Sequence, residues 1–251
     1  MSRPPVPPPP PSPARDPLLT ALFRSGDALR SRSVSAVVLS ATLDIPAPPP
    51  RLVADWEREI ASQLALAPGD VEALPLARAR MRWPDYRACV QAMADWTQAQ
   101  GLPGVLDSAD VALMACRGAR HHHDGAQYAS AAFCNLFVSE DRGLDVVFPF
   151  AGRRIALARG TALVFDTGQP HAVVRRGATA FDAADFASGL DCSQLFLTWE
   201  LPIEEAHVAC ALGIAFDVDA RSAARLHDEQ VLVNGAPAVL CPGSGRWLPA
   251  G

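Results

Sequence analysis

The sequence contains no lysine, so all 22 of its fixed basic side chains are arginine. Aspartate and glutamate total 27, and the formal net charge at pH 7 is −5. No basic stripe is visible, and we therefore expect neither nucleic acid nor an anionic membrane as a partner. Codon bias accounts for the missing lysine. Without lysine, any group that binds an anion must be an arginine, a histidine or a backbone amide.

Cysteine pairs and long apolar runs are also missing. The six cysteines include no Cys-x-x-Cys pair, which is typical of a reduced, cytoplasmic protein. No apolar run reaches 18 residues and no apolar signal core is present, so the sequence predicts neither a membrane span nor export. Apolar residues make up 49% and charged residues 20% of the 251-residue chain. These proportions indicate a globular protein with a substantial core.

The chain divides by composition. Residues 1–15 are rich in proline, and we expect them to form a disordered tail. Residues 16–251 are predicted to form a single domain. Its N-terminal part (16–105) is helical, its core (about 110–201) is β-rich, and it ends in a helix and a hairpin (202–251).

Apolar spacing predicts the individual elements outside the core. The predicted helices cover residues 16–30, 51–66, 84–99 and 203–213. Asp16 and Pro17 would cap the first of these helices. A strand is predicted over 33–43, and a hairpin over 230–241 with Asn234 and Gly235 at its turn.

Short apolar runs separated by turn residues fill the β-rich core. They cover residues 111–116, 129–138, 144–149, 153–158, 161–165, 171–175 and 194–201. Strands at this spacing indicate an antiparallel sandwich or barrel.

The run from His121 to Asp124 is the most unusual local feature. In an extended chain, residues two apart point to the same side, so His122 and Asp124 can converge on one ion. His123 and His121 point to the other side. His171 follows a Gly-Gln-Pro turn and begins a predicted strand. Two imidazoles and one carboxylate on one face leave positions open for O2 and a co-substrate, an arrangement that suits non-haem iron(II).

The stretch from His122 to Gly177 resembles the iron(II)- and 2-oxoglutarate-dependent dioxygenase superfamily. The residues that carry the resemblance are HHD (122–124), NLFVSED (135–141), GLDVVFP (143–149), GRRIALARGTALVFD (152–166) and QPHAVVRRG (169–177). The resemblance implies an α+β fold: a double-stranded β-helix, or jelly-roll, core of cupin type with N-terminal helices packed on it. It also implies that His122, Asp124 and His171 are the catalytic metal ligands.

The resemblance further implies a reaction and its cofactors. Iron(II), O2 and 2-oxoglutarate would be required, with ascorbate in support. A small molecule or a protein side chain would be hydroxylated. The family usually binds the distal carboxylate of 2-oxoglutarate with a basic residue on the strand after the distal histidine. Here that strand (194–201) has none, and strand alternation favours Arg175 instead. Asn135 and Tyr128 are further candidates for contact with 2-oxoglutarate.

Alternatives remain at this point. Arg117, Arg153, Arg154 or Arg176 could face the metal in place of Arg175. The function could be that of a cupin-like metal-dependent enzyme without 2-oxoglutarate, or of a non-catalytic barrel that binds a ligand. His207 and His227 fit surface or core positions.

Overall fold

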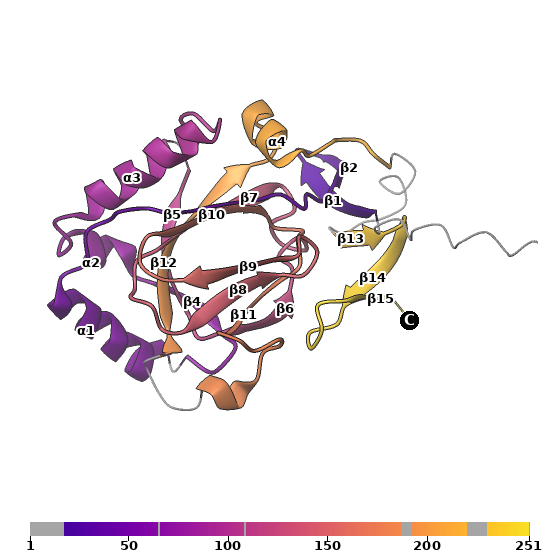
Figure 1. Ribbon diagram of the computed structural model, residues 1–251. Helices are drawn as coiled ribbons and strands as arrows, with labels where there is room; N and C mark the ends of the chain where they lie inside the picture. Colours follow the sequence, from indigo (N-terminus) through magenta and orange to yellow (C-terminus); the bar gives the residue numbers. More distant parts are fainter. Residues whose placement is uncertain (1–17, 65, 108, 187–191, 220–229, 251) are drawn as a thin grey trace, which may run out of the picture.

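Eight antiparallel strands form the centre of the computed structural model, which describes residues 18–64, 66–107, 109–186, 192–219 and 230–250. The eight strands are β5 (Val111–Cys116), β6 (Ala119–His122), β7 (Ala131–Phe137), β8 (Leu144–Phe148), β9 (Arg153–Leu157), β10 (Thr161–Asp166), β11 (His171–Arg175) and β12 (Gln194–Pro202). One sheet has the order β10-β7-β12-β5 and the other β6-β11-β8-β9. This order is that of a jelly roll, so the predicted fold class is confirmed. Figure 1 shows the two sheets facing each other.

Two strands and three helices from the N-terminal part extend and cover the larger sheet. β3 (Val38–Thr42) pairs with β10, and β4 (Val71–Leu74) pairs with β5. The helices α1 (Pro50–Glu59), α2 (Leu76–Arg80) and α3 (Tyr86–Ala99) lie along its outer face (Figure 1). Trp56 and Met93 share a buried cluster with Leu197 and Trp199 of β12. Alternation along β12 therefore buries one set of side chains under the helices and leaves the other facing the barrel interior.

The predicted helix over residues 16–30 is wrong. Residues 19–33 form an antiparallel hairpin of β1 (Leu19–Ser25) and β2 (Ala28–Ser33), with Gly26 at a positive φ of 59° in its turn. The apolar spacing was ambiguous because β1 is buried on both faces from Leu19 to Phe23. A strand covered on both sides lacks the polar alternation that would distinguish it from a helix. Residues 1–17, including the predicted tail and cap, lie outside the described residues.

A third sheet joins this hairpin to the C-terminal segment. Its order is β15-β14-β13-β1-β2, with β13 (Gln230–Val233), β14 (Ala236–Leu240) and β15 (Trp247–Pro249). The turn predicted at Asn234 and Gly235 is confirmed, since both residues have positive φ. Gly245 lies against His121, where an added Cβ would be 2.5 Å from the ring. The C-terminal segment therefore packs behind the histidine run.

The other predicted helices are found with shifted ends. The helix predicted over 51–66 is α1 followed by a π-helical turn, Ile60–Leu64, and the one over 84–99 is α3. The helix predicted over 203–213 is α4 (Ala206–Leu212), which ends at Gly213 in the left-handed conformation. A 3₁₀ turn, Ala183–Phe186, precedes β12. Within the described part of the chain, no helix has the length and apolarity needed to cross a membrane.

Candidate metal centre

The three predicted ligands meet at one end of the barrel. His122 ends β6, His171 begins β11, and the two are paired across the antiparallel ladder. Asp124 follows β6, and its backbone N–H donates to the carbonyl of Thr167, 2.8 Å away, in the turn before β11. The pairing of β6 with β11 thus brings together two segments far apart in the sequence.

The distances among the three side chains fit a single ion. One ligand atom from each of His122, Asp124 and His171 can be chosen so that all lie within 4.8 Å of one another. His122 Nε2 is 3.7 Å from Asp124 Oδ1, and His171 Nε2 is 3.5 Å from Asp124 Oδ2. Ligands about 2.1 Å from a shared metal lie about 3 Å apart when adjacent. Small side-chain movements would therefore complete the coordination.

Backbone carbonyls hold both imidazole rings in the orientation that ligation needs. His122 Nδ1 lies 2.7 Å from the Arg120 carbonyl, and His171 Nδ1 lies 3.1 Å from the Gln169 carbonyl. A carbonyl can only accept a hydrogen bond, so Nδ1 carries the proton in each ring. The Nε2 lone pairs then point toward Asp124 and are available to a metal.

Burial sets the charge states of the cluster. The pKa of His171 is well below its ordinary value because the ring is buried and, to a lesser degree, because it lies near His122. Burial raises the pKa of Asp124, and the neighbouring His122 and His123 oppose that rise. A neutral imidazole is the form that binds a metal, and a divalent cation would compensate for the buried carboxylate.

The other histidines lie apart from this cluster. His121 is 4% exposed and its Nδ1 has no hydrogen-bond partner in the described structure. His123 lies beside Trp247 of β15, with ring centroids 5.1 Å apart. His207 is half-buried on α4, and His227 falls outside the described residues. His121 and His123 therefore anchor the loop to the C-terminal segment.

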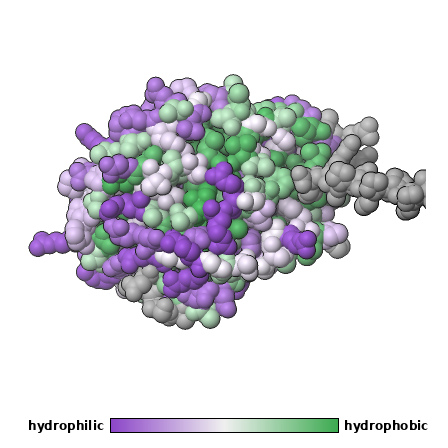
Figure 2. All heavy atoms as spheres, in the orientation of Figure 1, coloured by the Kyte–Doolittle hydropathy of each residue, from purple (hydrophilic) through white to green (hydrophobic). Residues whose placement is uncertain are grey.

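A cavity of about 440 Å³ opens beside the three ligands inside the barrel. Its polar lining consists of His122, Asp124, Gln127, Tyr128, Asn135, His171, Thr198 and Glu200. The rest of the lining is apolar, with Phe137, Phe165 and Phe196 among it. On the face of the molecule that Figure 2 shows, hydrophobic residues reach the surface near the centre, among hydrophilic ones. The size is in the range of small-molecule sites.

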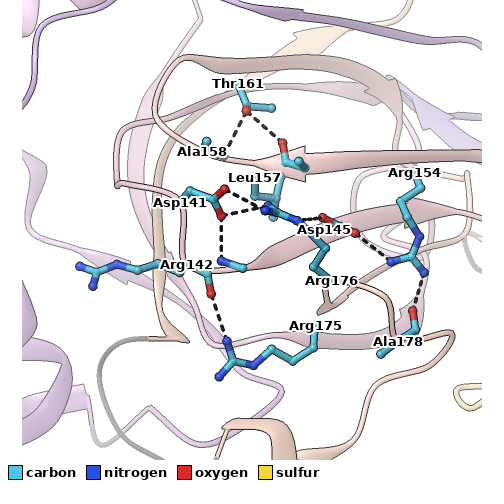
Figure 3. Close-up of polar contacts among 12 residues, drawn as sticks. Asp141, Arg142, Asp145, Arg154, Leu157, Ala158, Thr161, Arg175, Arg176 and Ala178 are labelled. Carbon is cyan, nitrogen blue, oxygen red and sulfur yellow. Dashed lines mark hydrogen bonds and ion pairs between the residues drawn. The ribbon is translucent and has the colours of Figure 1, made fainter.

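Arg175, the predicted carboxylate ligand, does not line this cavity. Its register opposite Leu144 places it on the same side of β11 as Val173. Its guanidinium, however, donates to the carbonyls of Asp185 and Arg142 and contacts the thiol of Cys192. Figure 3 shows Arg175 bound to the Arg142 carbonyl. These contacts occupy the guanidinium away from the cavity.

The alternative arginines are also bound elsewhere. Arg176 pairs with Asp141 and Asp145, and Arg154 pairs with Asp145 from the next strand (Figure 3). Arg117 donates to the carbonyls of Leu66 and Phe186, and Arg153 to Ser40. None of the arginines in the described ranges lines the cavity.

Asn135 and Tyr128, the other predicted ligand contacts, do line the cavity, whereas Glu200, Thr198 and Gln127 were missed. Asn135 is 7% exposed, and its Oδ1 has no hydrogen-bond partner among the described residues. Glu200 and Thr198 lie on β12 in the same alternation as Phe196, on the inner face. Alternation along the segment 194–201 is the signal in the sequence that places both side chains on the inner face.

No family model matches the chain, and no curated protein matches it. Several solved structures are similar. A prolyl-4-hydroxylase from Pseudomonas putida has 18% identity, a TM-score of 0.36 and coverage of 66% of this chain and 92% of that one. A viral collagen prolyl hydroxylase from Paramecium bursaria Chlorella virus-1, as its 2OG complex, has 8% identity, a TM-score of 0.38 and coverage of 66% and 94%.

The alpha-ketoglutarate-dependent epimerase SnoN from nogalamycin biosynthesis is a further similar structure. It has 14% identity, a TM-score of 0.31 and coverage of 82% of this chain and 92% of that chain. Similarity at these TM-scores says nothing about function, which must be inferred from the site itself.

The residues of the site fit a metal better than they fit 2-oxoglutarate. Two Nε2 atoms and a carboxylate, all facing an open cavity, are a donor set suited to non-haem iron(II). The distal carboxylate of 2-oxoglutarate would enter a cavity that no described arginine lines. A buried carboxylate without a cation or several hydrogen-bond donors is costly. The lining therefore offers 2-oxoglutarate the hydroxyl and amide groups of Tyr128, Asn135 and Thr198, but no arginine of the described residues.

Proposed function

We propose that this protein is a mononuclear iron(II)-dependent oxygenase, in which His122, Asp124 and His171 hold the metal. The supporting observation is the convergence of these three side chains at the wall of a cavity of about 440 Å³. Iron bound there supplies activation of O2 for the oxidation of an organic substrate. The substrate is a small molecule, or a side chain that reaches into the barrel.

The residues around the triad position the ligands and keep water away. The ring centroids of Phe165 and Phe148 lie 5.0 and 5.9 Å from that of His171, so both rings pack against this ligand and shield it from solvent. The backbone carbonyls on both Nδ1 atoms prevent the ligand rings from turning. The apolar wall therefore directs the reaction toward a substrate that enters through the open side.

Two co-substrate modes are compatible with iron at this position. The resemblance of residues 122–177 favours a 2-oxoglutarate-dependent hydroxylase, in which Asn135 and Tyr128 would be the available polar contacts. The cavity lining favours a second candidate, an iron oxygenase that does not use 2-oxoglutarate, because no described arginine lines it. Succinate release in the presence of iron(II), ascorbate and 2-oxoglutarate separates them. Succinate formed with O2 uptake supports the first mode, and iron-dependent O2 uptake without succinate supports the second.

The metal site itself is tested by anaerobic iron(II) titration. We expect His171→Ala and Asp124→Asn each to weaken iron binding by at least about 100-fold, because each removes one of three protein ligands. His207→Ala is the matched control, since it removes a histidine on α4 that lies apart from the cluster, and it should bind iron like the wild type. Unchanged iron affinity in His171→Ala would exclude the proposed centre.

A further inference from the structure

The cavity contains more acidic groups than a metal centre with one carboxylate ligand requires. Asp124 and Glu200 both line it, and Asp124 belongs to the metal cluster. Glu200 lies on β12 and is exposed toward the cavity opening. Within the described residues it has neither a hydrogen bond nor an ion pair. Its carboxylate is therefore available to a ligand.

Neighbouring polar groups form a patch with Glu200 on the inner face of the larger sheet. The β12–β7 register places Glu200 opposite Phe133 and Thr198 opposite Asn135. All four residues line the cavity. The Asn135 side chain is almost completely buried, yet its Oδ1 has no partner among the described residues. Asn135 therefore lines the cavity with an amide that is not fully used by its neighbours among the described residues, and this amide can bond a polar group of a ligand.

Aromatic rings complete the patch. The rings of Tyr128 and Phe133 lie 5.1 Å apart, and both line the cavity beside Glu200. Aromatic faces attract organic cations, and the attraction adds to that of a nearby carboxylate. The same surroundings repel an anion. No arginine from the described part of the chain lines the cavity to offset that repulsion.

We propose that the substrate carries an organic cation, an ammonium or guanidinium group, and that Glu200 is its counter-ion. Tyr128 and Phe133 contact the apolar part next to the cation, and the Asn135 amide bonds a neighbouring polar group. This inference rests on the proposed iron site, because it assigns the substrate class for that site. Glu200 determines specificity and takes no part in metal binding.

Binding of two aromatic probes of opposite charge to the full-length, zinc-loaded protein tests the proposal. Benzyltrimethylammonium cannot coordinate a metal, and benzenesulfonate coordinates metals weakly. We expect calorimetry to show the cation binding about tenfold more tightly than the anion, from an exposed charge pair and a cation–π contact. Glu200→Gln should reduce the preference to within about twofold, and Glu200→Arg should reverse it.

Glu205→Gln is the matched control, because Glu205 is an exposed glutamate five residues further along that does not line the cavity. It should retain the wild-type preference. Equal binding of the two probes, no binding of the cation at millimolar concentration, or no change in Glu200→Gln would overturn the proposal. Metal affinity is measured separately in each variant. Failure of the metal site therefore appears as lost zinc binding, whereas failure of the substrate class appears with zinc binding intact.

Discussion

At the scale of single residues, charge pairing explains why Arg176 and Arg154 do not serve the cavity. Arg176 forms two hydrogen bonds with Asp141, each 2.9 Å long, and a third with Asp145 at 3.0 Å. Asp145 is only 5% exposed and also receives Arg154 at 2.9 Å. Moving either arginine inward would leave a buried carboxylate without full compensation.

The Arg176 pair predicts a stability effect that depends on pH. The pKa of Asp141 is lowered first by the hydrogen bonds from Arg176 and then by the N–H of Gly143. The folded pKa lies below the unfolded one, so the pair stabilises the fold above the ordinary carboxyl pKa of 3.8 and loses this effect as pH falls through the folded pKa. Arg176→Ala should lower the free energy of unfolding by about 1 kcal/mol at neutral pH.

Urea unfolding of Arg176→Ala and the wild type across the acid range provides the measurement. The difference between them should shrink as pH falls below 3.8. Arg87→Ala, which removes an exposed arginine on α3, should match the wild type at every pH. A difference that stays constant into the acid range would mean that Asp141 has no part in it.

Single residues also show what the sequence can and cannot predict about the site. His122 and Asp124 could be selected because residues two apart share a side in extended chain. Arg175 was favoured by the same alternation, yet alternation fixes only the side of the strand. The guanidinium's partners, the carbonyls of Asp185 and Arg142, come from other segments. Alternation alone places Glu200 on the inner face of its strand, but only the fold shows which residues line the cavity with it.

At the scale of secondary-structure elements, a buried ion pair ties the N-terminal hairpin to the metal loop. Arg32 of β2 and Asp166 at the end of β10 have fully buried side chains joined at 2.6 and 2.8 Å. Asp166 also accepts from the backbone N–H groups of Ser35 and Gly168. Five residues after Asp166 comes His171. The pair therefore fixes the start of the turn that positions a ligand.

Breaking this pair should affect both stability and metal binding. Arg32→Met leaves Asp166 as an uncompensated buried charge, and we expect a loss of about 3–5 kcal/mol in unfolding free energy. Iron affinity should fall by about 10-fold, because the turn before β11 loses its support. Arg30→Met breaks an exposed, solvent-screened pair with Glu204 and Asp217, and it should cost far less stability than Arg32→Met and leave iron affinity unchanged. Denaturant unfolding and iron titration of both variants provide the comparison.

Elements differ in how well their patterns predict them. The core strands are short apolar runs between turns, which is why the sequence predicts them well. Once the jelly roll is predicted, the order of the strands within each of its sheets follows. The hairpin over residues 19–33 was mistaken for a helix, because a strand buried on both faces and an apolar helix share one composition. The strand is favoured over the helix because β1 pairs with β13, which begins at Gln230, about 200 residues further along the chain. A pattern local to residues 19–33 cannot contain this information.

At the scale of the whole molecule, the metal site couples distant parts of the fold. Its ligands come from both sides of the β6–β11 ladder, and the loop between His122 and Ala131 is bound to the turn before β11. Thr167 Oγ1 lies 2.7 and 2.8 Å from the carbonyl oxygens of Tyr128 and Ala131, and its single proton is donated to either of them. Unfolding separates His171 from His122 and Asp124, so a metal that binds the complete set of ligands only in the folded state must raise its stability.

The size of this effect can be predicted. At a free metal concentration about 100 times its dissociation constant, the stabilisation is about 2.7 kcal/mol. For a chain of this length, that corresponds to a rise in Tm of roughly 5–10 °C. Zinc is a suitable probe, because it binds the same type of ligands without redox chemistry. We therefore expect zinc to raise the Tm of the wild type and of His207→Ala by equal amounts.

Asp124→Asn provides the decisive comparison. Its metal-free form should be at least as stable as the wild type, because the substitution removes a carboxylate whose pKa burial has raised. The zinc-dependent rise in Tm should nevertheless disappear, since the charged ligand is gone. Differential scanning calorimetry with and without zinc measures both quantities on one sample. An equal rise in Asp124→Asn would show that zinc binds elsewhere on the chain, whereas loss of the rise assigns the coupling between metal and fold to the triad.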